Sequence, residues 1–441
     1  MATAGSAVGL GSLWRFPYIA GENGGGAFVL LYLIFTFFLG VPVFLAELII
    51  GRKSQKSSVL AYSDLANHSQ NWRILGWLNV LTCLLILAYY CVVCGWCLSY
   101  ILMSLTQFTA GKSIEEIKAV FGILQTSPGI NIFWLGLFIL INVGILLSGV
   151  RKGIEHWSKI LMPALFTILI ALFIYATTLD GFPQAVNFVF YPNFSKLTTS
   201  AILNALGMAF FTLSVGLGIL VTYGSYMQKD QNIPFNGIIV TVMTVFVSLI
   251  AALTIFPIVF TFNFPPSEGA GLVFQTLPVL FSKLPATILI STVFFALFVF
   301  AALTSTISLL EVIAANLIEL FDMKRLKAVI ISALLTFVIA IPCALSSSKA
   351  LFPSWELIYS QNFFETLSYI TASWFMPIAG LFTTIFIGWK IPKEEVFSEF
   401  LNGAKTRWIV YPWYYIVKWV APIAVIIIIL QEAGILNFGG R

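Results

Sequence analysis

Charged residues are scarce in this 441-residue chain: only 9% are Asp, Glu, Lys or Arg, whereas 59% are hydrophobic. Soluble domains carry about 25% charged residues, so this composition excludes a protein that is solvated on every side. The net charge of +5 is small for the length of the chain and gives no indication of nucleic-acid binding. The composition therefore predicts an integral membrane protein.

Histidine and cysteine are also rare, with two and five residues respectively. Three of the cysteines, Cys91, Cys94 and Cys97, recur every third residue, but a metal site would need a fourth ligand nearby. Buried free thiols behave as small hydrophobic groups, and we favour that interpretation. No loop pair indicates a disulfide. The chain also lacks paired intramembrane acids and a nucleophile beside a base, which disfavours an intramembrane enzyme.

Long apolar runs are what the chain does contain. A transmembrane helix needs about 20 apolar residues, and eleven runs reach that length. They lack the period-2 polarity of barrel strands, so we expect an all-α polytopic protein with eleven transmembrane helices. The runs lie at 2–20, 26–50, 74–105, 131–149, 157–177, 198–226, 234–263, 286–320, 325–345, 363–389 and 407–434.

Basic residues are divided unevenly between the loops on the two sides. Placing the 51–73 loop inside puts fifteen lysines and arginines in the cytoplasm and five outside, and cytoplasmic loops carry the excess of positive charge. We therefore expect a multi-pass protein of the inner or plasma membrane with a cytoplasmic N-terminus and an extracytoplasmic C-terminus. Only eight residues precede Gly9, so either the first helix is truncated or the true start lies upstream.

The tetrapeptide Val-Gly-Leu-Gly occurs in two of the runs, in AVGLGSLW from Ala7 and in SVGLGILV from Ser214. Glycine is about 1 kcal/mol worse than alanine in a helix, and in hydrocarbon an unwound stretch survives only inside protein or beside a polar cavity. One such tetrapeptide alone would favour close helix packing. Two of them, each with Ser and Thr nearby, favour a transporter binding site in which freed carbonyls hold a cation.

This interpretation predicts that the first and sixth helices are discontinuous. It divides the chain into a first inverted half at 1–177, a second at 198–389, and an additional helix at 407–434. In such a fold the half-helix N-termini face an anionic group of the substrate near the middle of the membrane.

Several motifs closely resemble those of the neurotransmitter:sodium symporter family, including its bacterial members. The resemblance implies a five-plus-five inverted repeat and a symporter that uses the sodium gradient to import amino acids or amines by alternating access. The motifs are GSAVGLGSLWRFPYIAGENGGGAF (5–28), AYYCVVCGW (88–96), GVRKGIEHWSKILMP (149–163), AFFTLSVGLGILVTYGSY (209–226), IFPIVF (255–260) and FAALTSTIS (300–308).

The resemblance implies one or two sodium ions bound by oxygen atoms. The family's second sodium site matches best, although a hydroxyl on a membrane helix more often bonds back to the preceding turn. At the first site, Ser12 and Thr244 stand where the family commonly has asparagine. The second site would use the carbonyls of Gly5, Val8 and Ala301 with the hydroxyls of Thr304 and Ser305. The first would use the carbonyls of Ala7 and Thr212 with the hydroxyls of Ser12, Thr212 and Thr244.

The resemblance also implies a substrate site around Gly9, where amine-carrying relatives have an aspartate. Because glycine has no carboxylate, the substrate should bring its own. Amides near Leu10 and Gly11 and the Tyr90 hydroxyl would hold that carboxylate. The amine would meet carbonyls near Ala7, Phe211, Thr212 and Ser214.

The implied side-chain pocket is largely apolar and uncharged. A charged amino acid would lose several kcal/mol through desolvation, so we expect neutral, mainly hydrophobic substrates. Leu217 replaces a phenylalanine of a bacterial relative, which favours a larger or aromatic side chain. The pocket residues are Ile86, Tyr90, Phe211, Ser214, Leu217, Ser305, Ser308 and Leu309.

Arg15 is the only charged residue of the first span, where a charge near the centre costs at least about 2.5 kcal/mol. The family's acidic partner on the tenth helix aligns with Ser368, and Glu365 lies three residues earlier on roughly the same face. We expect an outer gate of Arg15, Glu365 and Ser368, with snorkelling of Arg15 toward water as the alternative. Tyr90 and Phe211 would cover the substrate.

Chloride-dependent members of the family hold the ion with tyrosine, glutamine and serines, whereas independent members carry an acidic residue instead. Tyr32 and Ser248 match the chloride pattern, but Met208 stands where the glutamine would be. We predict weak or absent chloride dependence.

Two functional hypotheses remain. The first is a sodium-coupled symporter importing neutral, mainly hydrophobic or aromatic amino acids. The alternative, suggested by the short N-terminus and the altered first sodium site, is a non-transporting amino-acid binding protein or sensor of the same fold. Occluding aromatic residues and an uncharged pocket disfavour a channel. The other charges near or inside spans, to which we assign no role in transport, are Glu22, Glu47, Glu311 and Lys418.

Overall fold

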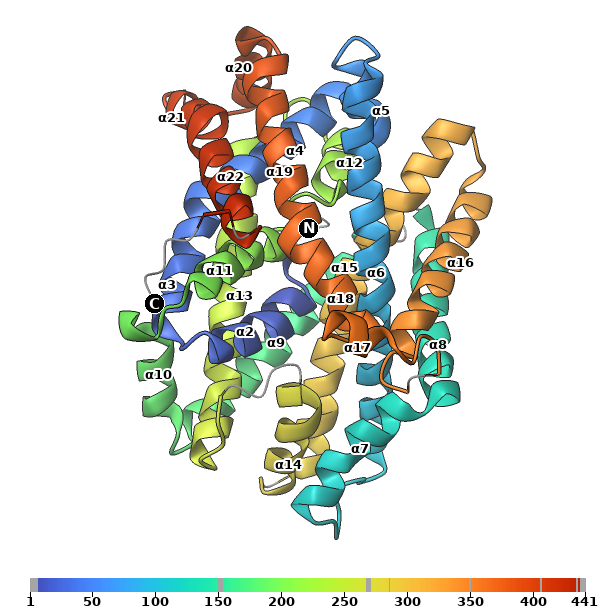
Figure 1. Cartoon of the computed structure of the whole chain (residues 1–441), viewed down its shortest axis with the longest axis vertical. Coiled ribbons are helices and arrows are strands. Elements are labelled where there is room, and N and C mark those ends of the chain that lie inside the picture. The colour runs from blue at the N-terminus through green and yellow to red at the C-terminus, as the bar shows by residue number, and fades with distance from the viewer. Residues whose placement is uncertain are drawn as a thin grey trace.

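The computed structural model describes residues 7–149, 154–266, 271–284, 286–348, 350–404, 407–433 and 435–436. Within these ranges the secondary structure consists of helices and turns, with no strand, which confirms the all-α class. Figure 1 shows the long helices running mostly along the longest axis of the molecule, with shorter helices at both ends.

Nine helical stretches in these ranges are long and apolar enough to cross a membrane. Together with the first and sixth spans, which are interrupted, they account for the eleven expected spans. Six of the nine are single helices: α6 (Gln70–Leu105), α8 (Pro128–Leu147), α9 (His156–Thr177), α13 (Ile233–Thr261), α15 (Thr287–Phe321) and α16 (Arg325–Ala344).

The other three contain π-helical turns, in which the chain winds more widely. The second span consists of α3 (Gly26–Phe35), η2 (Thr36–Gly40) and α4 (Val41–Ser54). The tenth consists of α18 (Phe363–Tyr369), η6 (Ile370–Phe375), α19 (Met376–Ile385) and η7 (Phe386–Lys390). The eleventh consists of α21 (Val410–Tyr415), η8 (Ile416–Val420) and α22 (Ala421–Glu432).

Short helices occupy the connections between spans. One of them, α7 (Ile114–Thr126), begins with a reciprocal capping box between Ser113 and Glu116, which satisfies two of the free amides at its start. The remaining ones are α5 (Ser58–Asp64), α10 (Phe182–Phe190), η4 (Phe194–Lys196), η5 (Leu272–Thr276), α14 (Leu277–Ser282), α17 (Trp355–Tyr359) and α20 (Lys393–Leu401).

Both Val-Gly-Leu-Gly tetrapeptides lie where helix is lost, as expected. In the first span, Val8 and Gly9 form a bend before η1 (Gly11–Arg15) and α2 (Phe16–Glu22). The half-helix expected before this bend, and with it the question of truncation, lies outside the described residues. In the sixth span, α11 (Thr199–Thr212) stops and α12 (Ile219–Ser225) begins after six non-helical residues.

The break in the sixth span depends on its glycines. Gly216 and Gly218 have φ angles of 80° and 71°, a region that glycine enters without the steric cost of a side chain. A Cβ atom on Gly216 would also lie 2.8 Å from the carbonyl oxygen of Met376. Alanine at this position would therefore strain the backbone and collide with the tenth span.

Helix α6 forms the axis around which the interrupted spans are placed. It packs along α15, α8 and α16 and against α5, and its most apolar stretch is more buried than that of the other long spans. The two halves of the sixth span pack on α3 and α4 respectively. The breaks are consequently held at the centre of the protein rather than against lipid.

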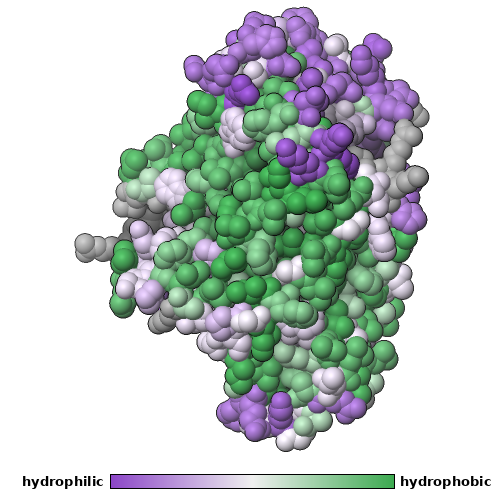
Figure 2. Space-filling model, turned by 90° about the vertical axis from the view of Figure 1, so that its right-hand side faces the viewer, coloured by the Kyte–Doolittle hydropathy of each residue, from purple (hydrophilic) through white to green (hydrophobic). Residues whose placement is uncertain are grey.

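The surface has the pattern of a membrane protein. Figure 2 shows a broad hydrophobic region between hydrophilic caps at the two ends of the molecule, so hydrocarbon would cover the middle and water the ends. The chain is thus a multi-pass membrane protein. Its orientation in the membrane and the division into halves at 1–177 and 198–389 stay predictions.

Candidate substrate and sodium site

A cavity lies where the interrupted first and sixth spans meet α6 and α15. It contains all the residues expected to contact substrate except Leu10 and Ser308, and it contains Ile219 in addition. No charged side chain lines it. The lining residues are Ala7, Gly9, Gly11, Ile86, Tyr90, Phe211, Thr212, Ser214, Leu217, Ile219, Ser305 and Leu309.

Leu10 and Ser308 lie outside the cavity for different reasons. The Leu10 side chain is fully buried in the surrounding core, so only its backbone is placed near the break. The Ser308 hydroxyl accepts a hydrogen bond from Tyr223 at 2.6 Å and donates one to the Thr304 carbonyl at 2.9 Å. Ser308 therefore fastens α12 to α15 beside the cavity.

The cavity is small in this conformation, at about 20 Å³. A single water molecule needs roughly 10–15 Å³ on the same scale. An amino acid can therefore enter only if the surrounding side chains or half-helices move apart, which is what a site that opens alternately to two sides requires.

Close backbone packing explains the glycines of the first break. A Cβ atom on Gly9 would lie 1.8 Å from the Ser305 hydroxyl oxygen, and one on Gly11 would lie 2.8 Å from the Phe211 ring. The same Cβ atom on Gly9 would lie 3.4 Å from the Tyr90 hydroxyl oxygen. Position 9 therefore has no room for a side chain unless Ser305 moves, and glycine itself offers no carboxylate.

A buried carboxylate holds the break of the sixth span. Glu47 lies on α4 and is fully buried, and its Oε1 atom accepts a hydrogen bond from the Gly216 N–H at 2.7 Å. This bond satisfies a backbone donor that the unwound segment leaves free. From the sequence we assign Glu47 no role in transport, although an acid inside an apolar run is itself a signal of function.

The expected ligands of the second sodium site gather on α15 beside the first break. The Thr304 hydroxyl donates to the Ala301 carbonyl at 2.8 Å, which is the back-bond that competes with ion binding. Ser305 and Val8 are both buried here, whereas Gly5 lies outside the described residues. All of these donors are neutral oxygens, which fit a hard monovalent cation better than a strongly held divalent one.

The expected first sodium site contains a hydroxyl without a partner. Ser12 is buried on η1, and its oxygen forms no hydrogen bond with any residue that the structure describes. The Thr212 hydroxyl donates to the Met208 carbonyl at 3.0 Å, and that of Thr244 to the Val240 carbonyl at 2.9 Å. An unpaired buried hydroxyl costs about 1–3 kcal/mol. This cost would be removed if the Ser12 oxygen bound a cation.

The expected chloride residues lie next to the first sodium site. The Tyr32 hydroxyl is 3.2 Å from the Thr212 hydroxyl and 3.4 Å from that of Ser248. Ser248 in turn donates to the Thr244 carbonyl at 3.0 Å. The structure therefore connects Tyr32 and Ser248 to the sodium residues through hydroxyl groups, and chloride dependence stays a prediction.

Arg15 does not contact its expected acidic partner. Its guanidinium carbon is 4.4 Å from the centre of the Phe211 ring. The Glu365 carboxylate instead accepts a hydrogen bond from the Asn362 backbone at 3.1 Å and caps α18. The part of the chain that the structure describes contains no ion pair between Arg15 and Glu365, and the gate of Arg15, Glu365 and Ser368 stays a prediction.

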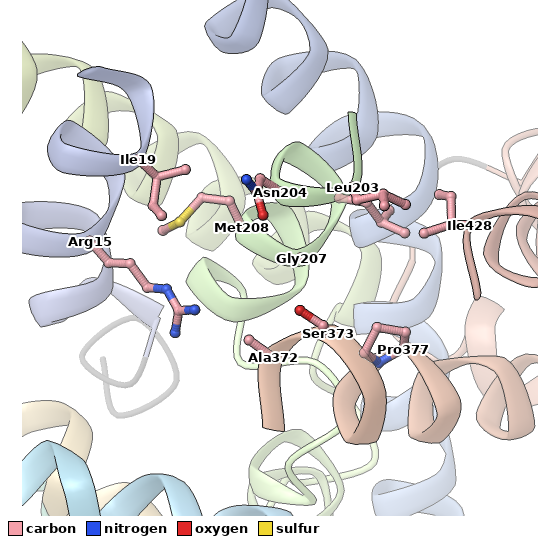
Figure 3. Close-up of a pocket in the computed structure, with 11 residues that line it drawn as sticks. Arg15, Ile19, Leu203, Asn204, Gly207, Met208, Ala372, Ser373, Pro377 and Ile428 are labelled. Carbon is pink, nitrogen blue, oxygen red and sulfur yellow. The ribbon is translucent and has the colours of Figure 1, made fainter. Parts of the chain in front are cut away.

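Arg15 also contributes to a second cavity, between α11 and the tenth span. Figure 3 shows the guanidinium of Arg15 directed toward this space, which Met208, Asn204 and Ser373 also line. This cavity shares no lining residue with the substrate cavity.

The geometry defines a class of protein. Two interrupted helices that meet at a buried, uncharged cavity, with neutral oxygens and free backbone groups around it, form the arrangement of a secondary transporter. The comparison with family models gives the particular family: the model of the sodium:neurotransmitter symporter family matches residues 1–119 and 125–438. The chain belongs to this family of transporters, which is not a family of enzymes.

Relatives agree with this assignment over the whole chain. A protein of Bacillus subtilis described as the uncharacterized sodium-dependent transporter YhdH is 40% identical over 439 residues, or 99% of this chain and 96% of the relative. A sodium-dependent transporter of Haemophilus influenzae is 36% identical, over 98% of this chain and 96% of the relative. The crystal structure of MhsT in complex with L-phenylalanine superposes with a TM-score of 0.91 at 38% identity, covering 98% of this chain and 97% of MhsT.

Proposed function

We propose that this protein imports neutral, mainly hydrophobic or aromatic amino acids and couples their movement to sodium by alternating access. Family membership supports sodium-dependent transport. The amino-acid substrate is supported by the geometry of the central cavity and by the similarity to MhsT, which was crystallised with L-phenylalanine.

The observation that carries the proposal is the closed space at Gly9. Because a Cβ atom there would lie 1.8 Å from the Ser305 oxygen, the protein supplies no carboxylate at this point. The start of the half-helix after Gly9 presents free N–H groups and the positive end of a helix dipole. A substrate carboxylate satisfies both, and a bound sodium ion beside Ser12 neutralises the remaining charge.

The walls of the cavity select against charged substrate side chains. Ile86, Leu217, Ile219 and Leu309 line it, and none of them can pair a charge. A glutamate or lysine side chain would be buried there without a partner, which costs several kcal/mol. Phenylalanine and leucine would instead gain about 25 cal/mol for each Å² of apolar surface buried.

The experiment is uptake of labelled phenylalanine, leucine, glutamate and lysine into proteoliposomes, with external sodium replaced by potassium or choline. We expect phenylalanine and leucine to accumulate only with an inward sodium gradient, and glutamate and lysine not to accumulate. Equal uptake in the three salts would contradict sodium coupling. Sodium-independent binding of phenylalanine without accumulation would favour the amino-acid sensor instead.

A further inference from the structure

A large cavity lies far from the substrate site, at the end of the molecule that carries α7 and α14 (Figure 1). It measures about 700 Å³ and is enclosed by the last turn of α6, the loop that follows it, and the start of α15. None of the residues that line it is acidic. Its lining combines apolar side chains, such as Phe108 and Ile288, with hydroxyl groups and one cation, Lys112.

The start of α15 supplies backbone donors. Its first residues, Thr287, Ile288 and Leu289, line the cavity. The preceding residue, Ala286, has a left-handed φ of 56° and no side chain that can cap the helix, and the first turn contains no acid. The free N–H groups and the dipole of this 35-residue helix therefore favour an anion in the cavity.

Two buried serines add hydroxyl groups. Ser104, 2% exposed, and Ser291, 4% exposed, both line the cavity. The Ser104 oxygen is buried and has no hydrogen-bond partner among the residues that the structure describes. Buried hydroxyls are normally paired, so the Ser104 hydroxyl points to a ligand that accepts hydrogen bonds.

Lys112 supplies the positive charge. It lies in the loop after α6, is exposed, and lines the cavity. Within the described ranges no carboxylate pairs with it, since the nearby Glu116 is engaged in the capping box of α7. A lysine beside a helix N-terminus and a free hydroxyl is the set of groups that recognises a phosphate.

Exposed apolar side chains lie on the same two helix ends that line the cavity. Leu102 and Leu105 on the last turn of α6 are 53% and 56% exposed, and Leu289 on α15 is 65% exposed. Exposed leucines at the ends of membrane spans mark the depth at which acyl chains meet headgroups. A phosphate bound at this depth belongs to a phospholipid rather than to the aqueous phase.

We propose that this cavity binds the phosphate of a phospholipid headgroup in the leaflet on the α7 and α14 side. Lys112, the two serine hydroxyls and the start of α15 contact the phosphate, and the acyl chains lie along Leu102, Leu105 and Leu289. The site is independent of the substrate cavity. A lipid held here would connect α6 to α15, the two helices that also form the substrate pocket.

The test uses the full chain purified in detergent, with lipid retention measured by native mass spectrometry. The probes are dioleoyl-phosphatidylglycerol, dioleoyl-glycerol, which lacks the phosphate, and inorganic phosphate as competitor. The variants are Lys112→Gln and Ser104→Ala. Lys118→Gln is the matched control, because it removes the same charge from α7 at a residue that does not line the cavity.

We expect retention of phosphatidylglycerol but not of dioleoyl-glycerol. Lys112→Gln should weaken retention about fivefold, the effect of one lysine on an anionic lipid, and Ser104→Ala should also weaken it. Lys118→Gln should leave it unchanged. Equal retention of the two lipids, or an equal loss in Lys112→Gln and Lys118→Gln, would overturn the proposal. Displacement of the lipid by millimolar inorganic phosphate would assign the cavity to a free anion and overturn the lipid assignment.

Discussion

Buried polar groups differ in their hydrogen bonding between the central site and the end of the molecule that carries α5 and α20 (the α20 end). At the centre, the hydroxyls of Ser12 and Thr36 are buried without partners in the described part of the chain. At the α20 end, a fully buried arginine, Arg52, donates to the Glu399 carboxylate and to the carbonyls of Glu399 and Gln231. The two central hydroxyls are left unpaired, whereas each nitrogen of the buried Arg52 guanidinium has a partner.

A second paired group lies near the α20 end and shows the same principle. Arg325 donates to both carboxylate oxygens of Glu311, at 2.7 and 3.2 Å, and to the Leu146 carbonyl. Tyr226, which follows α12, donates to Glu311 at 2.8 Å. These bonds tie α12 to α15 and α16 through the fully buried Glu311 and the partly exposed Arg325.

Buried polar groups therefore have two functions in this protein, stabilising a conformation at the α20 end and binding ligands at the centre. A buried charge pair is costly to break, because each partner is then left alone in a low dielectric. The α20 end therefore stabilises one closed conformation. The neutral hydroxyls at the centre stabilise little by themselves, and they become satisfied only when ions or substrate bind. The stability of the protein should depend on the α20 end, and its affinity for ligand should depend on the central hydroxyls.

The largest expected effect is on Arg52. We predict that Arg52→Ala lowers the free energy of unfolding by about 3–5 kcal/mol, because it leaves the Glu399 carboxylate, whose side chain is only 16% exposed, without its partner. The measurement is thermal or denaturant unfolding of the purified protein in detergent. The matched control is Lys53→Ala, whose pair with Glu395 is partly exposed and should contribute about 0–1 kcal/mol. Equal destabilisation by both variants would contradict the distinction between buried and exposed pairs.

The next effect is expected at Gly9. We predict that Gly9→Ala weakens sodium-dependent phenylalanine binding by about 1–3 kcal/mol, because the added methyl group forces Ser305 out of place. Binding of labelled phenylalanine to the purified protein measures this change. In Gly144→Ala on α8 the new methyl group meets nothing within 4 Å, so binding should stay as in the original protein. Unchanged binding in Gly9→Ala would show that the first break is not packed against α15 when substrate binds.

The hydroxyls of α15 test the second sodium site. We predict that the double variant Thr304→Ala/Ser305→Ala weakens sodium-dependent phenylalanine binding by about 1–3 kcal/mol, the cost of leaving polar partners unsatisfied. Sodium titrations of phenylalanine binding measure the change. Thr306→Ala on the same helix is the control, since its hydroxyl binds Asn142 at 2.7 Å instead. A sodium dependence that is unchanged in the double variant would mean that the site is misplaced.

Much of the fold could be predicted from the sequence because apolar length and glycine have direct physical consequences. The run 157–177 corresponds to α9, which spans His156–Thr177. The run 198–226 is interrupted at its second Val-Gly-Leu-Gly, because unpaired backbone needs a protein environment and glycine permits the positive φ angles that such a turn requires. These are local effects, and they can be read from neighbouring residues.

The pairings of buried charges could not be predicted, because they depend on distant segments. Arg52 and Glu399 are 347 positions apart, and nothing in the pattern around either residue indicates the other. Glu47 posed the same difficulty, since its partner is a backbone N–H of an unwound segment. The Glu365 contact is different: Asn-x-x-Glu at a helix start is a capping pattern. That local pattern indicates the cap of α18 that the structure shows, whereas the family resemblance predicts a contact with Arg15.

The smallest effect on stability is expected at Ser12. The Ser12→Ala variant tests most directly the contrast between the central hydroxyls and the paired groups of the α20 end. Because the Ser12 hydroxyl has no partner among the described residues, Ser12→Ala should leave the free energy of unfolding unchanged or slightly higher when sodium is absent. If this oxygen contacts sodium, the same variant should weaken sodium-dependent phenylalanine binding by about 0.5–1.5 kcal/mol. Unfolding without sodium and binding with sodium are therefore measured on one preparation.

Thr82→Ala should show the opposite pair of effects, a loss of stability without a loss of sodium affinity. The Thr82 hydroxyl donates to the Leu78 carbonyl of its own helix at 2.7 Å and is buried away from the cavity. Its removal leaves that carbonyl with only its helical hydrogen bond, so a small loss of stability of about 0.5–1 kcal/mol is expected with no change in sodium affinity. If Ser12→Ala behaved like Thr82→Ala, losing stability but not sodium affinity, the central hydroxyls would be structural like those elsewhere, and the contrast between the two regions would not exist.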